Sequence, residues 1–176
     1  MKSAIREIEL KEGMKVSMSG HTITLSSQDK SVSRDLGKEK IKVEIQDQKI
    51  MISTIKNTRR ENALLNTLQK HLQNLVQGLE KIFEYKMTIV YSHFPMTVTV
   101  KEKWVEINNF TGEKKTRKSR ILPGAQVEVK GKDVIVRGHN KEAVGQTAAN
   151  LENVTKVKGK DTRVYQDGIY IVSKPK

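Results

Sequence analysis

Cysteine is absent from this chain of 176 residues, which excludes disulfide bonds, thiolate metal sites and cysteine nucleophiles. No apolar run approaches the roughly 20 residues that a membrane-spanning helix needs. Residues 1–10 also lack the apolar core of a signal peptide. The composition suits a reducing compartment, and we expect a cytoplasmic protein that does not cross a membrane.

Motifs for catalysis and cofactor binding are missing as well. The glycines are too scattered for a phosphate-binding loop, and the four histidines have no metal-ligand spacing with one another or with carboxylates. No local pair of carboxylates stands out for acid–base chemistry. The sequence therefore predicts no enzymatic activity, no cofactor, no metal site and no small-molecule substrate.

Positive charge, by contrast, is plentiful and concentrated in the second half. The chain has 33 Lys and Arg residues against 20 Asp and Glu residues, a net charge of +13. Residues 1–84 hold 15 basic and 11 acidic residues, whereas residues 85–176 hold 18 and 9. This excess favours a polyanionic partner, either nucleic acid or an anionic membrane surface.

Apolar positions recur at a nearly constant spacing in the two halves. The matching positions are 80 to 84 residues apart, and they are Val16 and Val98, Ile23 and Val105, Val43 and Val127, Ile50 and Val134, Ile52 and Val136, Ala63 and Ala143, and Thr67 and Thr147. Small loop insertions within a duplicated unit explain the drift. Because alternation of Val and Ile also arises by chance, two unrelated β-rich stretches are the alternative.

Each half shows the alternation of short strands followed by one helical pattern. Strands are predicted at residues 5–10, 16–19, 22–26, 31–36, 41–46 and 49–54, then at 85–91, 96–101, 104–108, 113–118, 126–130 and 134–137. Thr58 and Glu61 have capping-box spacing before an apolar stripe that runs from Leu64 to Ile82, and Asn140 can cap a helix over 141–155. We predict an α+β fold of two tandem duplicated domains, residues 1–83 and 84–176. Each has an antiparallel or mixed β-sheet packed against a long α-helix.

Basic residues cluster twice in the second half. The first cluster lies on a predicted hairpin after Phe110-Thr111-Gly112 and contains Lys114, Lys115, Arg117, Lys118 and Arg120. Strand alternation predicts Lys115 and Arg117 on one face and Lys114 and Lys118 on the other. The second cluster follows the second helix and contains Lys156, Lys158, Lys160, Arg163 and the aromatic Tyr165. Both can contact RNA phosphates or stack on bases, and the alternative is an ordinary solvated surface.

The aromatic-rich segment from Tyr85 to Pro95 begins as a predicted core strand. Alternation directs Tyr85, Met87, Ile89 and Tyr91 toward the core. Lys86 and His93 are then left as surface candidates for RNA contact.

Five motifs together resemble one known family. They are Tyr85-Lys86-Met87, Tyr91-Ser92-His93-Phe94-Pro95, Asn109-Phe110-Thr111-Gly112-Glu113, Leu122-Pro123-Gly124, and residues 160–170 with the sequence KDTRVYQDGIY. In order and spacing they resemble the archaeal and eukaryotic branch of the large-subunit ribosomal protein L-six family, called L-nine in eukaryotes, over essentially the whole chain. The family more often has Phe at the position of Tyr165.

The resemblance implies two similar α+β domains, no enzymatic activity and a structural place in the large ribosomal subunit. It implies that residues 84–176 supply most of the binding to large-subunit ribosomal RNA, near the base of the acidic stalk and the sarcin-ricin loop. Neighbouring large-subunit proteins would be partners, and translational GTPases that dock there would be served indirectly. The implied RNA-facing parts are residues 114–120, 122–124 and 156–170.

Two other classes of function fit the charge alone. A free-standing RNA-binding regulatory module would need a recognition helix or exposed base-reading aromatics, and neither is evident in the sequence. A membrane-surface protein would need a cationic amphipathic helix, whereas the long helix carries mixed charge and a core-like leucine stripe.

Overall fold

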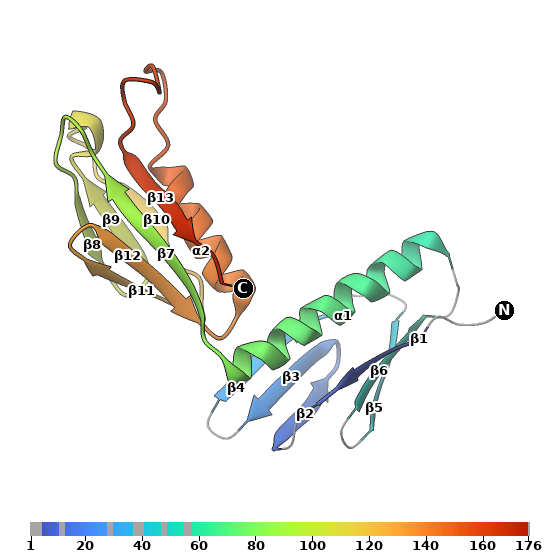
Figure 1. Ribbon diagram of the computed structural model, residues 1–176. Coiled ribbons are helices and arrows are strands. Elements are labelled where there is room, and N and C mark those ends of the chain that lie inside the picture. The colour runs from blue at the N-terminus through green and yellow to red at the C-terminus, as the bar shows by residue number, and fades with distance from the viewer. Residues whose placement is uncertain are drawn as a thin grey trace. The chain divides into compact units, whose positions relative to one another are not determined.

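The computed structural model describes residues 5–10, 13–27, 30–36, 41–46, 49–54 and 58–175. The chain divides into two compact units, Met1–Lys81 and Ile82–Lys176, called here the N-terminal unit and the C-terminal unit (Figure 1). Each unit combines antiparallel sheets with one α-helix. The predicted α+β class is therefore confirmed.

The N-terminal unit has two three-stranded sheets, with strand orders β1-β6-β5 and β2-β3-β4. Its elements are β1 (Ile5–Glu9), β2 (Met14–Ser19), β3 (Thr22–Ser27), β4 (Lys30–Asp35), β5 (Ile41–Gln46), β6 (Lys49–Thr54) and α1 (Arg59–Glu80). The predicted cap of α1 is present, because the Thr58 side chain accepts a hydrogen bond from the Glu61 backbone N–H.

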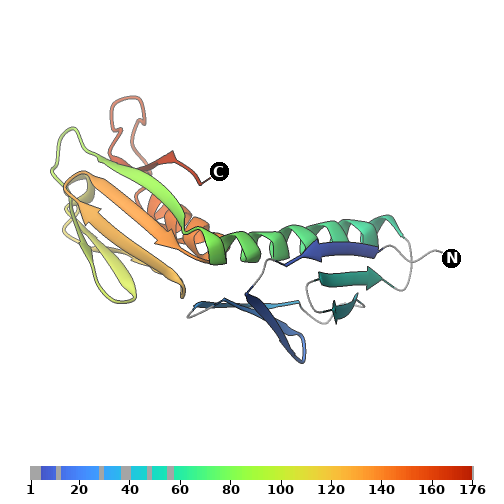
Figure 2. The same cartoon turned by 60° about the horizontal axis from the view of Figure 1, so that its bottom comes forward.

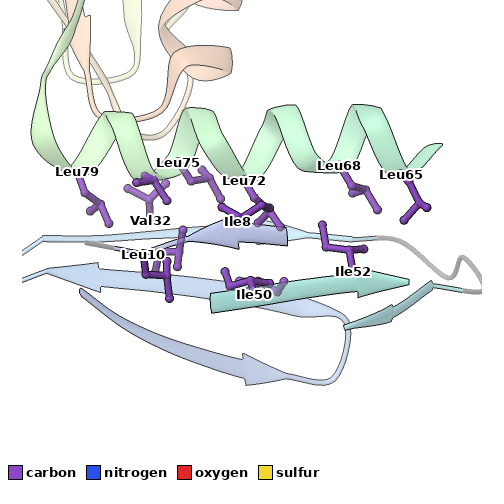
Figure 3. Packing of buried hydrophobic residues seen from close by; sticks show 13 residues of the cluster. Ile8, Leu10, Val32, Ile50, Ile52, Leu65, Leu68, Leu72, Leu75 and Leu79 are labelled. Atoms are coloured by element: carbon purple, nitrogen blue, oxygen red, sulfur yellow. The ribbon is translucent and has the colours of Figure 1, made fainter. Parts of the chain in front are cut away.

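The core of the N-terminal unit lies between α1 and the sheets (Figure 2). Figure 3 shows the leucines of α1 above Ile8, Ile50 and Ile52, and Leu65 and Leu72 are completely buried there. The predicted apolar stripe extends too far along the chain, because its last residue, Ile82, lies outside the helix and is exposed. Lys81 has an extended conformation and ends α1, so the side chain of Ile82 leaves the helical face.

The C-terminal unit has a four-stranded sheet of order β11-β12-β7-β13 and a three-stranded sheet of order β10-β9-β8. Its elements are β7 (Phe83–Val90), β8 (Thr97–Val100), β9 (Trp104–Asn108), the 3-10 turn η1 (Phe110–Gly112), β10 (Arg117–Arg120), β11 (Ala125–Lys130), β12 (Asp133–Gly138), α2 (Lys141–Val154) and β13 (Gly168–Ser173). Asn140 caps α2 as predicted, since its Oδ1 accepts hydrogen bonds from the N–H groups of Glu142 and Ala143.

The two units share a strand order. Sheet β1-β6-β5 corresponds element by element to β7-β12-β11, and sheet β2-β3-β4 corresponds to β8-β9-β10. Strand β13 is additional and pairs with the side of β7 that β12 leaves open. The sequence pattern did not predict β13, because a unit that closes with its helix leaves residues 168–173 unassigned.

The predicted strand over residues 113–118 is wrong in its position. Asn109 and Thr111 have left-handed φ values of 57° and 50°, and residues 110–112 form the 3-10 turn η1 instead of a tight hairpin turn. Lys114 and Lys115 therefore lie in bends, and β10 begins only at Arg117. Tyr91 also differs from its prediction, because it lies beyond the end of β7 and is exposed.

Two hydrogen bonds and one close backbone approach fix the loop 122–124 and β13 in the C-terminal unit. The buried Thr147 hydroxyl donates to Ala143 O and accepts from Leu122 N–H, which anchors the loop 122–124. The buried Thr155 hydroxyl accepts from Ile169 N–H and so anchors β13. Gly138 allows the loop 122–124 to pass close to β12, because a Cβ atom at Gly138 would stand 2.2 Å from the Gly124 carbonyl oxygen.

Candidate nucleic-acid interface

A groove of about 710 Å³ lies between β10 and α2 in the C-terminal unit. It brings together cations from both predicted basic clusters, because Lys115, Lys118 and Arg120 come from the hairpin and Lys158 follows α2. Among the described residues, Lys115, Arg120 and Lys158 have no ion-pair partner, and all three are exposed. The groove is therefore a cationic surface with charges free to meet phosphate.

Arg117 also lines the groove, but its guanidinium is bound within the protein. Its Nε and Nη2 donate to the two carboxylate oxygens of Glu113 at 2.9 and 2.6 Å, and Nη1 donates to Val154 O at 2.6 Å. The guanidinium carbon stands 4.2 Å from the ring centre of the buried Phe110. Arg117 thus ties β10, η1 and the end of α2 together, a role that its position in a basic cluster did not indicate.

The hydrogen bond from Arg117 lowers the pKa of Glu113, with a smaller electrostatic contribution from Lys160. Because the folded-state pKa is depressed, the stabilisation is present above the unfolded-state pKa and is lost as pH falls through the folded-state value. We expect Glu113→Gln to destabilise the protein most at neutral pH. Its free energy of unfolding should converge on that of the wild type only at an acidic pH below the depressed folded-state pKa of Glu113. Urea titrations at both pH values measure this, and a constant difference would contradict it.

Lys118 lies on the face of β10 opposite to Arg117. Its Nζ is 3.2 Å from a carboxylate oxygen of Glu106, and Lys101 contacts the other oxygen at 2.7 Å. Hydrogen bonds from Lys101 and then Lys118 lower the pKa of Glu106. One carboxylate between two lysines leaves a net positive charge beside the groove, which Lys118 alone of the three lines.

Three loops meet at one end of the C-terminal unit, namely residues 91–96, η1 and residues 156–167 (Figure 1). The His93 and Tyr165 rings pack edge to face with centres 5.5 Å apart, and the Lys160 Nζ stands 4.6 Å from the Tyr165 ring centre. Lys160 also donates to Thr111 O at 3.4 Å. Asp167 is buried and accepts a hydrogen bond from Ser92 N–H at 2.7 Å. The structure therefore brings His93, Lys160 and Tyr165 into one cluster, whose contacts hold the loops together.

Comparison with known proteins places this chain in a family. The family model described as Ribosomal protein L6 matches residues 94–168. Large ribosomal subunit protein uL6 of Methanococcus vannielii is 44% identical over 168 residues, which cover 96% of this chain and 92% of that protein. The uL6 proteins of Methanosarcina mazei and Methanobrevibacter smithii are 43% and 40% identical and cover 99% and 98% of this chain, and 99% and 97% of their own lengths. The chain belongs to the uL6 family. Members of this family are structural proteins without enzymatic activity, as the sequence predicts.

In this uL6 family member, some of the remaining residues that were predicted to contact RNA are paired with other side chains, whereas others are exposed. Arg163 is held by Asp161, with Nη2 to Oδ2 at 2.8 Å, and that hydrogen bond raises the pKa of Arg163. Lys114 and Lys156 are exposed and have no ion-pair partner among the described residues. Lys86 lies on the β11-β12-β7-β13 sheet and contacts Glu84, which also faces Arg137. Its surroundings are thus of mixed charge, unlike the groove.

The side chain that sequence reasoning missed is Trp104. This tryptophan of the uL6 chain begins β9, is 45% exposed and lines the groove beside Arg120, its cross-strand neighbour. The signal was available, because Trp104 is the only tryptophan of the chain and precedes a buried position, Val105.

Helices and acidic clusters add no further candidate. Neither α1 nor α2, the α-helices of the described ranges, is long and apolar enough to span a membrane. Those same ranges hold no group of three or more His, Asp or Glu side chains that could bind a metal ion.

Proposed function

We propose that this chain is a structural constituent of the large ribosomal subunit in the cytoplasm, and that its C-terminal unit binds large-subunit ribosomal RNA. Membership of the uL6 family supports the assembly, since its relatives are named as large ribosomal subunit proteins. The observation that carries the RNA contact is the groove between β10 and α2, where Lys115, Arg120 and Lys158 present charges that no described side chain pairs. Phosphate contacts of this kind supply affinity without reading sequence.

We further propose that the RNA contact lies near the stalk base and the sarcin-ricin loop. There the protein would contact neighbouring large-subunit proteins and would support the docking of translational GTPases indirectly. The additional contacts would come from Lys114, Lys156, Lys160, Arg163, Tyr165, Lys86 and His93. Lys114 and Lys156 are the best placed of these, because their charges are exposed and unpaired among the described residues.

We also infer that the two units are tandem duplicates. The sequence places the boundary of these domains between residues 83 and 84, two residues after the boundary between the compact units. The shared strand order and the recurring apolar offsets support this inference. The C-terminal copy would be the main RNA-binding domain because it holds the larger excess of positive charge. Strand β13 and the loop before it would be later additions to that copy.

Sedimentation of a lysate of the source cells tests the ribosomal assignment. We expect the protein to cofractionate with large subunits and to be released from them by high salt, because its contacts are largely electrostatic. Chemical probing of the ribosomal RNA in subunits with and without the protein would then locate the contact. A protein found only in the free pool would instead favour the free-standing RNA-binding regulator.

A further inference from the structure

Trp104 and the outer edge of β10 face the same groove, so this surface offers an aromatic ring and backbone donors in addition to positive charge. Trp104 lies opposite Arg120 in the β9–β10 ladder and is 45% exposed although it is large and apolar. An aromatic ring in this position can stack on any nucleic-acid base, because every base offers a flat π face. Neither packing in the core nor attraction of phosphate by the lysines explains why an indole is exposed at this position.

The outer edge of β10 directs backbone N–H donors toward the groove. Ile121 N–H donates to Lys103 O on the β9 side, whereas Arg120 O accepts from Asn150 Nδ2 on the α2 side. Residues in an antiparallel ladder alternate in direction, so the N–H groups of Lys118 and Arg120 point away from β9. They are suitable donors to a phosphate oxygen, as backbone N–H groups are in many nucleic-acid complexes.

Ser119 also lines the groove, but its hydroxyl is not a contact for a ligand. Ser119 is 1% exposed, and its Oγ, which has no hydrogen-bond partner among the described residues, is closed to solvent. Strand alternation places this side chain on the face of β10 opposite to Arg120 and its cross-strand neighbour Trp104. Lys115 and Lys158 line the groove as well and add positive charge.

We propose that this groove takes an RNA segment with an unpaired base, which stacks on Trp104 while the adjoining phosphate lies along the outer edge of β10. Lys115, Arg120 and Lys158 neutralise the phosphates, and the stacked base fixes the position of the strand. The proposal rests on the proposed RNA-binding function and adds to it the form of RNA that is recognised. A duplex would present its phosphates but no free base face to Trp104.

The single tryptophan is itself the probe for this site. We expect the Trp104 emission of the full chain to be quenched by a single-stranded oligoadenylate, in proportion to binding measured by anisotropy of the labelled RNA. A duplex RNA should quench much less at equal occupancy. Trp104→Ala should weaken binding of the single strand roughly 5- to 150-fold, which is the range for loss of one stacked base. Trp104→Phe should restore most of the affinity.

The matched control is Val100→Ala, which removes an exposed apolar side chain from the neighbouring strand β8 without touching the groove. It should bind RNA like the wild type. The salt dependence of Trp104→Ala should equal that of the wild type, because no phosphate contact is lost. Thermal unfolding followed by circular dichroism confirms that each variant is folded.

The outcomes separate the two proposals. If RNA binds with steep salt dependence but Trp104 emission and the Trp104→Ala affinity are unchanged, the groove assignment is wrong while RNA binding stands. Equal quenching by duplex and single strand overturns the unpaired base. If neither oligoadenylate, duplex nor deproteinised large-subunit RNA binds, the proposed function itself fails.

Discussion

Arg117→Ala is expected to lower the free energy of unfolding of the C-terminal unit by roughly 2 to 4 kcal/mol. The substitution removes a paired guanidinium that is only 22% exposed, with charge-assisted hydrogen bonds of about 1.5 to 3 kcal/mol and a cation–π contact of about 0.5 to 2 kcal/mol. It also leaves Val154 O without its donor at the end of α2. Urea unfolding followed by Trp104 emission reports on this unit.

Two further variants test whether the loss of stability comes from the specific contacts of the Arg117 guanidinium. Arg117→Lys should recover only part of the loss, because an ammonium cannot form the two parallel hydrogen bonds to Glu113. Lys118→Ala, one residue away on the opposite face, breaks an exposed ion pair and should change the free energy of unfolding by less than about 1 kcal/mol. An Arg117→Ala protein that unfolds like the wild type but loses RNA affinity would assign Arg117 to the RNA instead.

The strands and helices that follow a regular apolar period could be predicted from the sequence. The Thr58 and Asn140 caps and the leucines from Leu65 to Leu79 appear in the structure where their spacing indicates. These features depend on residues within one or two turns of each other, so a local pattern contains most of the information. The same holds for the β11–β12 hairpin, whose turn is marked by Gly131.

The role of Arg117 could not be predicted, because it depends on tertiary packing that the local sequence pattern does not contain. Glu113 is four residues away, but Val154 and Phe110 reach it only through the packing of α2 and η1 against β10. The left-handed conformations of Asn109 and Thr111 could not be predicted from the sequence either. Thr disfavours the left-handed region and is held in it by its surroundings. The tertiary contacts are therefore needed to separate the structural Arg117 from Lys115 and Arg120, which have no ion-pair partner among the described residues.

The cations of the groove should account for much of the salt dependence of RNA binding. Replacing Lys115, Arg120 and Lys158 together by Ala is expected to reduce the slope of log affinity against log salt by about 2, at roughly 0.7 per phosphate contact for single-stranded RNA. At about 0.1 M salt the same relation predicts a loss of affinity of roughly 100-fold. Arg117 is left out of this set because its loss is expected to destabilise the unit, which would confound the effect on RNA binding.

The fold should survive that triple substitution, since the three side chains are exposed and make no ion pair among the described residues. The matched control removes the same charge elsewhere in the C-terminal unit, through Lys130→Ala, Lys132→Ala and Lys174→Ala, all of which are exposed and lie outside the groove. Long-range attraction alone would weaken both triple variants equally, because screening acts on net charge at distances beyond about 10 Å. Direct phosphate contact instead requires a larger loss of slope for the groove variant. Equal slopes for the two variants would show that Lys115, Arg120 and Lys158 belong to an ordinary solvated surface and make no direct phosphate contact.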